Sequence, residues 1–217
     1  FEEPYFEMLD AYFDNNEDEI LEACPRITGV IQVGGHIGQE INTFLNKLNG
    51  KRMIIFEPDK DSYDQIPDNP HVIKVNSAVG NYNGNAMLNI ASNGQSSSLL
   101  LPKVHLIEHP WVHFIGQKQV NIVRLDDWIK ANNIHEYNFL SIDAQGYELE
   151  ILLGSSDLLK SIDYIMCEIN YKELYSNCPH VQQIDSYLHN YGFTRIKTVW
   201  CDDAGWGDGL YVKNIIT

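Results

Sequence analysis

The sequence predicts an α/β fold, in which helices flank a mostly parallel sheet that carries one reversed strand at an edge. Short apolar runs alternate with amphipathic segments along most of the 217 residues. The run at 30–33 is followed by a glycine turn and an amphipathic segment, the typical start of a nucleotide-binding unit. The runs at 194–200 and 209–212 are joined by so short a connection that only an antiparallel pair can form.

The other elements follow from the same patterns. Apolar residues at helical spacing predict a helix that starts at Ile37 and ends at Asn49-Gly50. The segment 80–119 is less regular and contains the polar loop 92–98, which is typical of lids and binding loops. Further strands are expected at 53–56, 71–75, 86–90, 120–123, 139–142 and 164–167, and helices at 125–129, shortly after 146 and at 181–191.

Charge and cysteine usage exclude several classes of partner. The net charge is −15, with 30 acidic and 15 basic side chains, which argues against nucleic acid or an anionic membrane as the main partner. No apolar run approaches the roughly 18 residues of a membrane span. The four cysteines form no C-x-x-C pair, so we expect free thiols in a reducing, cytoplasmic compartment and no structural zinc.

The domain organisation is expected to be simple. Residues 1–26, with the acidic run 14–19, predict an N-terminal helical cap or linker, and 27–217 suit one domain with a full core. The chain opens at Phe1 without an initiator Met, so we expect a processed chain or part of a longer protein.

Polar side chains follow several of the predicted strands. In an open α/β sheet, ligands bind beyond the carboxyl ends of the strands. Glu57 follows Gly34 by 23 residues at the end of the next strand, where a carboxylate takes the ribose hydroxyls of a bound nucleoside. The alternative is a packing turn with an unrelated surface Glu. The polar positions at these strand ends are 34–38, Glu57, 76–77, Asp143 and 168–170.

The glycine turn reads G-G-H-I-G from Gly34 and lacks the middle glycine of the G-x-G-x-x-G fingerprint, because His36 occupies it. Pyrophosphate approaches the backbone at that glycine, so a dinucleotide is disfavoured. A nucleoside without phosphates fits better, and S-adenosylmethionine is the common one. A NAD-dependent oxidoreductase and a catalytically silent nucleoside-binding module remain the alternatives.

Four motifs resemble the FkbM-type S-adenosylmethionine-dependent methyltransferases: V-G-G-H-I-G, F-E-P, S-I-D-A-Q-G-Y-E-L-E-I-L-L-G, and C-E-I-N followed by Y-L-H-N-Y-G-F. The resemblance covers about residues 28–214. It implies the class I methyltransferase (Rossmann-like) three-layer sandwich, whose seven-stranded sheet has one antiparallel strand from the C-terminal hairpin. It also implies O-methylation of sugars, for example rhamnose, or other natural products. The family's usual opening Asp is Gln32 here, and its usual Asn is His36.

The resemblance implies a cofactor site in the same positions. Glu57 would hold the ribose, Ser77 or Ala78 would lie near the adenine, and Asp143 would lie near the methionine end. The cofactor-binding residues implied are Gly34, Gly35, His36, Gly38, Glu57, Ser77, Ala78 and Asp143.

A sugar hydroxyl needs a base within hydrogen-bond reach, since methyl transfer from a sulfonium is an in-line displacement. Asp143 is the first candidate, Glu168 the second, and His109 could approach from the irregular segment. Asp143 could instead only orient the cofactor or the backbone. Asp143, Glu168 and Asn170 could also bind Mg²⁺, but no dense carboxylate cluster accompanies them, so no metal is expected.

The acceptor is expected to be a sugar or glycan. Tyr171 and Trp206 could stack on sugar rings, and Asp208 could accept a substrate hydroxyl. The chain could be fused to glycosyltransferase domains, which would resemble an arrangement in large algal viruses. A viral protein of this kind would be expected in the host cytoplasm.

Overall fold

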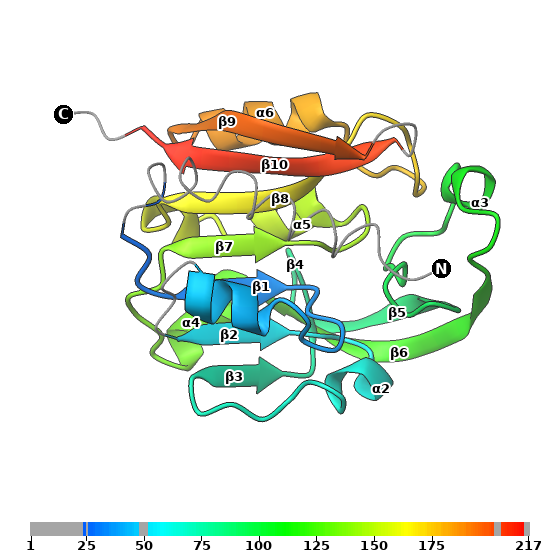
Figure 1. The fold of residues 1–217 in the computed structure, drawn as a ribbon, viewed down its shortest axis with the longest axis horizontal. Helices are drawn as coiled ribbons and strands as arrows, with labels where there is room; N and C mark the ends of the chain where they lie inside the picture. The colour runs from blue at the N-terminus through cyan, green and yellow to red at the C-terminus, as the bar shows by residue number, and fades with distance from the viewer. Residues whose placement is uncertain (1–23, 25, 48–51, 202–204, 215–217) are drawn as a thin grey trace.

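The computed structural model describes residues 24, 26–47, 52–201 and 205–214. The expected N-terminal cap over 1–26 falls almost wholly outside these residues, as does the expected helix end at 49–50. Figure 1 shows a mixed sheet through the middle of the molecule, with helices on both of its faces. No described helix combines the length and the apolar character needed to cross a bilayer.

The central sheet has seven strands in the order β3-β2-β1-β7-β8-β10-β9. Neighbours from β3 to β8 are parallel, whereas β10 is antiparallel to both β8 and β9. The seven strands are β1 (Val30–Val33), β2 (Met53–Phe56), β3 (Val72–Val75), β7 (Phe139–Ile142), β8 (Tyr164–Asn170), β9 (Phe193–Cys201) and β10 (Trp206–Lys213).

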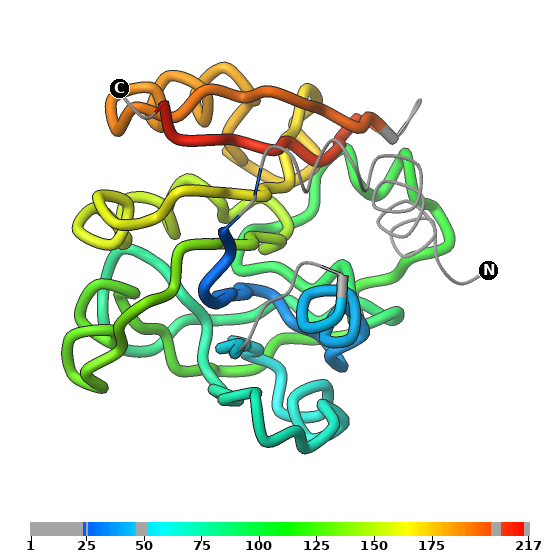
Figure 2. The backbone as a smooth tube through the Cα atoms, turned by 60° about the vertical axis from the view of Figure 1, so that its left-hand side comes forward, coloured from blue at the N-terminus to red at the C-terminus, as the bar shows by residue number. Residues whose placement is uncertain are grey.

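The prediction that the reversed strand lies at an edge is wrong. Strand β9 is the edge strand, and β10 fills the space between β9 and β8. The red and orange strands of the hairpin run side by side beyond the yellow β8 in Figures 1 and 2. The difference arises because the chain crosses from β8 to the edge through a helix, and the hairpin then folds back against β8.

Helices cover both faces of the sheet, which explains why β1, β2 and β7 are buried along their whole length. Successive residues of β1 belong to different cores: Val30 lies in the same core cluster as Phe44, and Ile31 lies in the cluster that contains Leu152. In Figure 1 the helical segment of residues 41–47 lies in front of the sheet, and α4, α5 and α6 lie behind it. The helices are α2 (Lys60–Tyr63), α3 (His105–Glu108), α4 (Leu125–Ala131), α5 (Glu148–Leu153), the 3₁₀ turn η2 (Leu158–Lys160) and α6 (Val181–His189).

The first helix begins later than predicted. Its first helical residue is Ile41 rather than Ile37, and residues Thr43–Lys47 form a π-helix, η1. The preceding residues remain in turns because His36 and Gly38 have φ angles of +43° and +80°, which a right-handed helix does not allow. The turn between β1 and η1 is therefore long enough to approach a ligand with several consecutive residues.

A second sheet occupies the segment that the sequence suggested was irregular. It has the order β4-β6-β5 and is formed by β4 (Ala78–Gly80), β5 (Gly84–Ala91) and β6 (Phe114–Arg124). Most of the first half of β6 is exposed, so it carries no apolar run that would predict a strand. In Figure 1, β5, β6 and α3 lie beyond the arrowheads of the parallel strands, on the side where the candidate site is found.

Candidate active site

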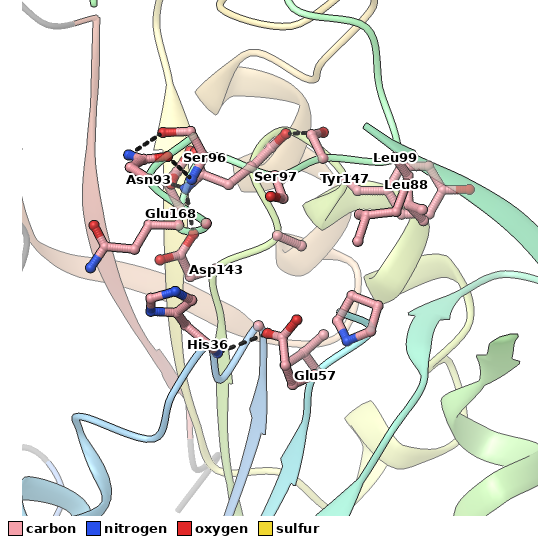
Figure 3. Close-up of a pocket in the computed structure, with 18 of the residues that line it drawn as sticks. His36, Glu57, Leu88, Asn93, Ser96, Ser97, Leu99, Asp143, Tyr147 and Glu168 are labelled. Carbon is pink, nitrogen blue, oxygen red and sulfur yellow. Dashed lines mark hydrogen bonds between the residues drawn. The ribbon is translucent and has the colours of Figure 1, made fainter. Parts of the chain in front are cut away.

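A cavity of about 1390 Å³ lies at the carboxyl ends of β1, β2 and β7. Single-ligand pockets typically measure about 300–1,000 Å³, so the cavity has room for more than one small molecule. Figure 3 shows His36, Glu57, Asp143 and Glu168 along one side of it, and Leu88, Leu99 and Tyr147 along another. The lining comes mainly from residues 33–40, 56–58, 77–79, 92–99, 105–112 and 143–147.

The glycine turn after β1 brings the backbone to the floor of this cavity. Gly34 has a φ angle of +86°, and a Cβ atom there would lie 1.7 Å from the carbonyl oxygen of Asp143. No other residue type fits this position. Gly34 and His36 line the cavity, whereas the predicted cofactor residues Gly35 and Gly38 are absent from its described lining and instead pack against apolar side chains.

Glu57 is held in one orientation by two backbone groups. Its Oε2 accepts a hydrogen bond from the N–H of His36 at 2.8 Å, and its Oε1 accepts one from the N–H of Asp59 at 2.7 Å. The pKa of Glu57 is raised to about 8, chiefly by burial and also by the charges of Asp59 and Asp143, while the two backbone bonds oppose the shift. Each oxygen keeps a second acceptor site, so this side chain can take the hydroxyl pair of a ribose.

The opposite side of the cavity is apolar and suits a flat ring. Leu88, Leu99 and Tyr147 lie together there in Figure 3, and Ala78 also lines the cavity. Ser77, the other predicted adenine neighbour, lines it too, but its hydroxyl donates to the backbone oxygens of Ala78 or Asn121 at 2.8 and 3.2 Å.

The half-buried Asp143 and the buried Glu168 form a carboxyl pair that is bridged by one amide. The Nε2 of Gln145 donates to Oδ1 of Asp143 at 2.7 Å and to Oε2 of Glu168 at 2.8 Å. The hydroxyl of Tyr175 can donate to Oε1 of Gln145 at 2.8 Å, the shorter of two contacts, or to the backbone oxygen of Ser96 at 3.1 Å, and the shorter bond orients the amide. Burial, followed by the charges of Asp143 and Glu148 and a hydrogen bond with Asp143, holds the pKa of Glu168 well above its usual range. The pKa of Glu168 is thus shifted in the direction that favours its protonated form.

Two further buried carboxyl groups, those of Glu148 and Asp208, lie near Glu168. Oε1 of Glu148 accepts hydrogen bonds from the N–H groups of Ala144 and Gly146 at 3.1 and 2.9 Å, which fixes the turn after β7. Asp208 lies opposite Glu168 in the β8–β10 ladder, and burial holds its pKa well above the ordinary value. The predicted substrate residue Asp208 is 3% exposed and is absent from the described cavity lining.

His109 lines the cavity from the segment around α3, together with His105. Burial lowers the pKa of both imidazoles, that of His105 to about 4, and His109 adds to the shift of His105. Both rings are therefore neutral at pH 7, and a neutral imidazole can accept a proton.

Of the two aromatic residues predicted to contact substrate, the structure brings one to the cavity. Trp206, at the start of β10, lines it. Tyr171 is 40% exposed, packs against Trp200 with ring centroids 5.1 Å apart, and is absent from the described lining. A tryptophan such as Trp111 is more often expected to pack in a core or a lid. In the structure it lines the cavity and is 64% exposed.

Three residues of the site carry weak sequence signals. Gln145 lies inside the D-A-Q-G motif, but nothing in the motif indicates that it bridges two acids. Tyr175 and Glu40 reach the site only through tertiary structure. Among the described residues, no group of three or more His, Cys, Asp or Glu side chains is arranged to hold a metal ion.

The strand order and the site at its carboxyl edge define a Rossmann-like methyltransferase fold. The magnesium protoporphyrin IX methyltransferase ChlM of Synechocystis PCC 6803, solved with bound S-adenosylmethionine, aligns with a TM-score of 0.51 at 8% identity, over 99% of this chain and 86% of that one. The sequence of residues 32–195 matches the Methyltransferase FkbM domain, and the chain belongs to this family.

Two relatives with curated names are similar over most of the chain. The 2-O-methyltransferase NoeI of Sinorhizobium fredii is 27% identical over 158 residues, which cover 67% of this chain and 65% of that protein. The hexuronic acid methyltransferase AglP of Haloferax volcanii is 23% identical over 159 residues, which cover 70% of this chain and 59% of that protein. The matched region thus spans less than two thirds of either relative.

Proposed function

We propose that this protein is an S-adenosylmethionine-dependent O-methyltransferase that acts on a hydroxyl of a sugar or glycan. The observation that carries the proposal is the amide-bridged carboxyl pair of Asp143 and Glu168, which lies at the edge of a cavity large enough for cofactor and acceptor together. Membership of the FkbM family supports methyl transfer. The names of NoeI and AglP, a 2-O-methyltransferase and a hexuronic acid methyltransferase, support a carbohydrate acceptor.

The charge of the cavity supports a cationic nucleoside rather than a dinucleotide. The described lining contains the carboxyl groups of Glu40, Glu57, Asp143 and Glu168, and it contains no Lys or Arg. A pyrophosphate would find no basic partner there and would lie beside acids whose ionisation it opposes. S-adenosylmethionine carries a sulfonium and an ammonium group, and both are attracted by buried carboxylates.

The residues of the pair have separate roles in the reaction that we propose. S-adenosylmethionine, when bound, would supply the methyl group and leave as S-adenosylhomocysteine. Asp143 takes the proton of the acceptor hydroxyl, which raises the nucleophilicity of the oxygen. The raised pKa of Glu168 favours its protonated form, and in that form it does not compete for this proton. Gln145 keeps both carboxyl groups in place, and Tyr175 keeps the amide of Gln145 in the orientation that donates to them.

The acceptor part of the cavity supports a sugar ring. Trp206 and Trp111 present aromatic surface, and His109 adds a neutral polar group. Aromatic faces stack on the apolar faces of pyranose rings, while hydroxyls find partners at the polar edge. A neutral deoxysugar such as rhamnose is one acceptor of this kind.

Ligand binding and product analysis test the proposal in two steps. We expect S-adenosylmethionine and S-adenosylhomocysteine to raise the melting temperature and NAD to leave it unchanged; a ligand at 100 times its dissociation constant stabilises by about 2.7 kcal/mol. Mass spectrometry of oligosaccharides incubated with enzyme and cofactor is then expected to show the gain of one CH₂ unit. Stabilisation by NAD alone contradicts the methyltransferase assignment. Cofactor binding without transfer to any glycan identifies a silent binding module.

A further inference from the structure

Glu40 is a buried carboxyl group of the cavity that neither the sequence motifs nor the proposed chemistry uses. It precedes the first helical residue of the 41–47 segment, and its carbonyl oxygen accepts a hydrogen bond from the N–H of Phe44 at 2.9 Å. Its side chain lines the cavity although the residue is only 7% exposed. A buried acid that faces a binding cavity is costly unless a cation or hydrogen-bond donors compensate it.

Gln32 lies directly beside Glu40, at the β1 position where the family's usual motif has an Asp. Gln32 is 2% exposed, and its Nε2 donates a hydrogen bond to Oε2 of Glu40 at 3.1 Å. Its Oε1 is buried and has no hydrogen-bond partner in the described structure. Gln32 is absent from the described lining of the cavity, so its contribution is to hold the Glu40 carboxyl group, while its own unpartnered acceptor lies beside that group.

The surroundings of Glu40 favour a positive ligand group over any anion. Asp143 and Asp208 are its charged neighbours, and no described Lys or Arg lines the cavity. Burial, with a contribution from Asp143, raises the pKa of Glu40 to about 7, while the Gln32 hydrogen bond opposes the shift. An ammonium group placed here would keep Glu40 ionised.

We propose that Glu40 binds the α-ammonium group of the cofactor's methionine portion, with Gln32 as its positioning partner, so that the carboxylate missing from β1 is supplied from the start of the following helix. This assignment rests on the proposed cofactor, S-adenosylmethionine, and it adds a specificity-determining residue to that site. The Glu40 side chain selects ligands that carry an amino acid portion, whereas Glu57 selects the ribose that all adenosine ligands share.

Two ligands that differ only in the amino acid portion test the assignment by calorimetry, with no acceptor needed. S-adenosylhomocysteine carries the ammonium group, and 5′-methylthioadenosine lacks it. We expect Glu40→Gln to weaken S-adenosylhomocysteine binding by about tenfold or more and to change 5′-methylthioadenosine binding by less than about threefold, since hydrogen bonds to charged groups are the stronger ones. Glu150→Gln, which alters a half-buried Glu of α5 away from the cavity, is the matched control and is expected to affect neither ligand.

A reciprocal exchange separates charge from packing. The double variant Gln32→Asp/Glu40→Gln returns the carboxylate to β1, and we expect it to recover most of the lost S-adenosylhomocysteine affinity. Equal weakening of both ligands by Glu40→Gln, or unchanged S-adenosylhomocysteine binding, overturns the assignment. If the variants show the expected difference between the two ligands but the protein transfers no methyl group, the Glu40 assignment stands and the proposed O-methyltransferase function is contradicted.

Discussion

At the scale of single residues, the proposed chemistry requires Asp143 and Glu168 to differ in protonation, so that only one of them accepts the proton of the acceptor hydroxyl. Asp143 and Glu168 receive hydrogen bonds from the same amide nitrogen, that of Gln145. Two adjacent carboxyl groups in a buried site titrate as a pair, and the environment decides which one keeps the proton. Here Glu168 is the more deeply buried of the two, and its pKa is raised, which agrees with the proposed role of Asp143 as the base.

Replacement of Asp143 by Asn tests this division of roles. The amide preserves the size of the side chain but cannot accept the hydroxyl proton, so we expect the rate of methyl transfer to fall by at least about 10²-fold. S-adenosylhomocysteine binding, measured by calorimetry on the same variant, is expected to change by less than about tenfold, because the ribose and ammonium contacts involve other residues. Turnover close to that of the wild type contradicts the base assignment.

At the scale of elements, the turn between β1 and η1 is the least replaceable part of the fold. The φ angle of Gly34 is +86°, and a Cβ atom there would meet the backbone of Asp143, which cannot move without separating β1 from β7. The same contact places the glycine turn against Asp143, the residue that we propose as the base. A side chain at position 34 would therefore disturb both the backbone turn and the position of Asp143.

We expect Gly34→Ala to lower the free energy of unfolding by at least about 2 kcal/mol, because it combines an unfavourable φ angle with overpacking against backbone. Urea denaturation measures the loss. Gly116→Ala is the matched control, since a Cβ atom at Gly116 in β6 has no neighbour within 4 Å; we expect a change of less than about 0.5 kcal/mol there. Equal stability of the two variants would contradict the packing argument.

The elements also show what the sequence could predict. Strands 53–56 and 139–142 were predicted with correct bounds because buried parallel strands are continuous apolar runs. The sequence predicts only a small part of β6, because the exposed residues of this strand follow no apolar pattern. It predicts the first helix to begin four residues too early, because hydrophobic spacing does not reveal positive φ angles. The strand-end residues Glu57 and Asp143 were predictable from position. The contacts of Gln145 with Tyr175 and of Gln32 with Glu40 were not, since they depend on side-chain orientations set by packing.

At the scale of the whole molecule, the cavity makes the ligand-free protein sensitive to alkaline pH. Burial raises the pKa of Glu57 to about 8 and that of Glu40 to about 7. Both acids keep their proton up to a higher pH in the folded state than in the unfolded chain, where the pKa of Glu is about 4.3. Unfolding therefore releases protons, and stability falls as the pH rises toward these values. His36, His105 and His109 have lowered pKa values and act in the opposite direction, but only below about pH 6.5.

We accordingly expect the free energy of unfolding without ligand to decrease by at least about 1 kcal/mol between about pH 6.5 and 8. Saturating S-adenosylmethionine is expected to reduce this dependence, because its positive groups favour the ionised carboxylates. Urea denaturation at several pH values, with and without cofactor, provides the measurement. A stability that rises over this interval would show that the buried acids are already ionised in the folded protein.

The internal position of β10 has a consequence for the order of events during synthesis. A ribosome delivers β8 and β9 before β10, so the edge of β8 stays open until the last described strand emerges and pairs with seven of its residues. Until then Trp206 is missing from the cavity, and β8 presents free backbone groups that other chains can pair with. Completion of the sheet and completion of the binding site are thus one event, and the nascent chain depends on protection from aggregation up to that moment.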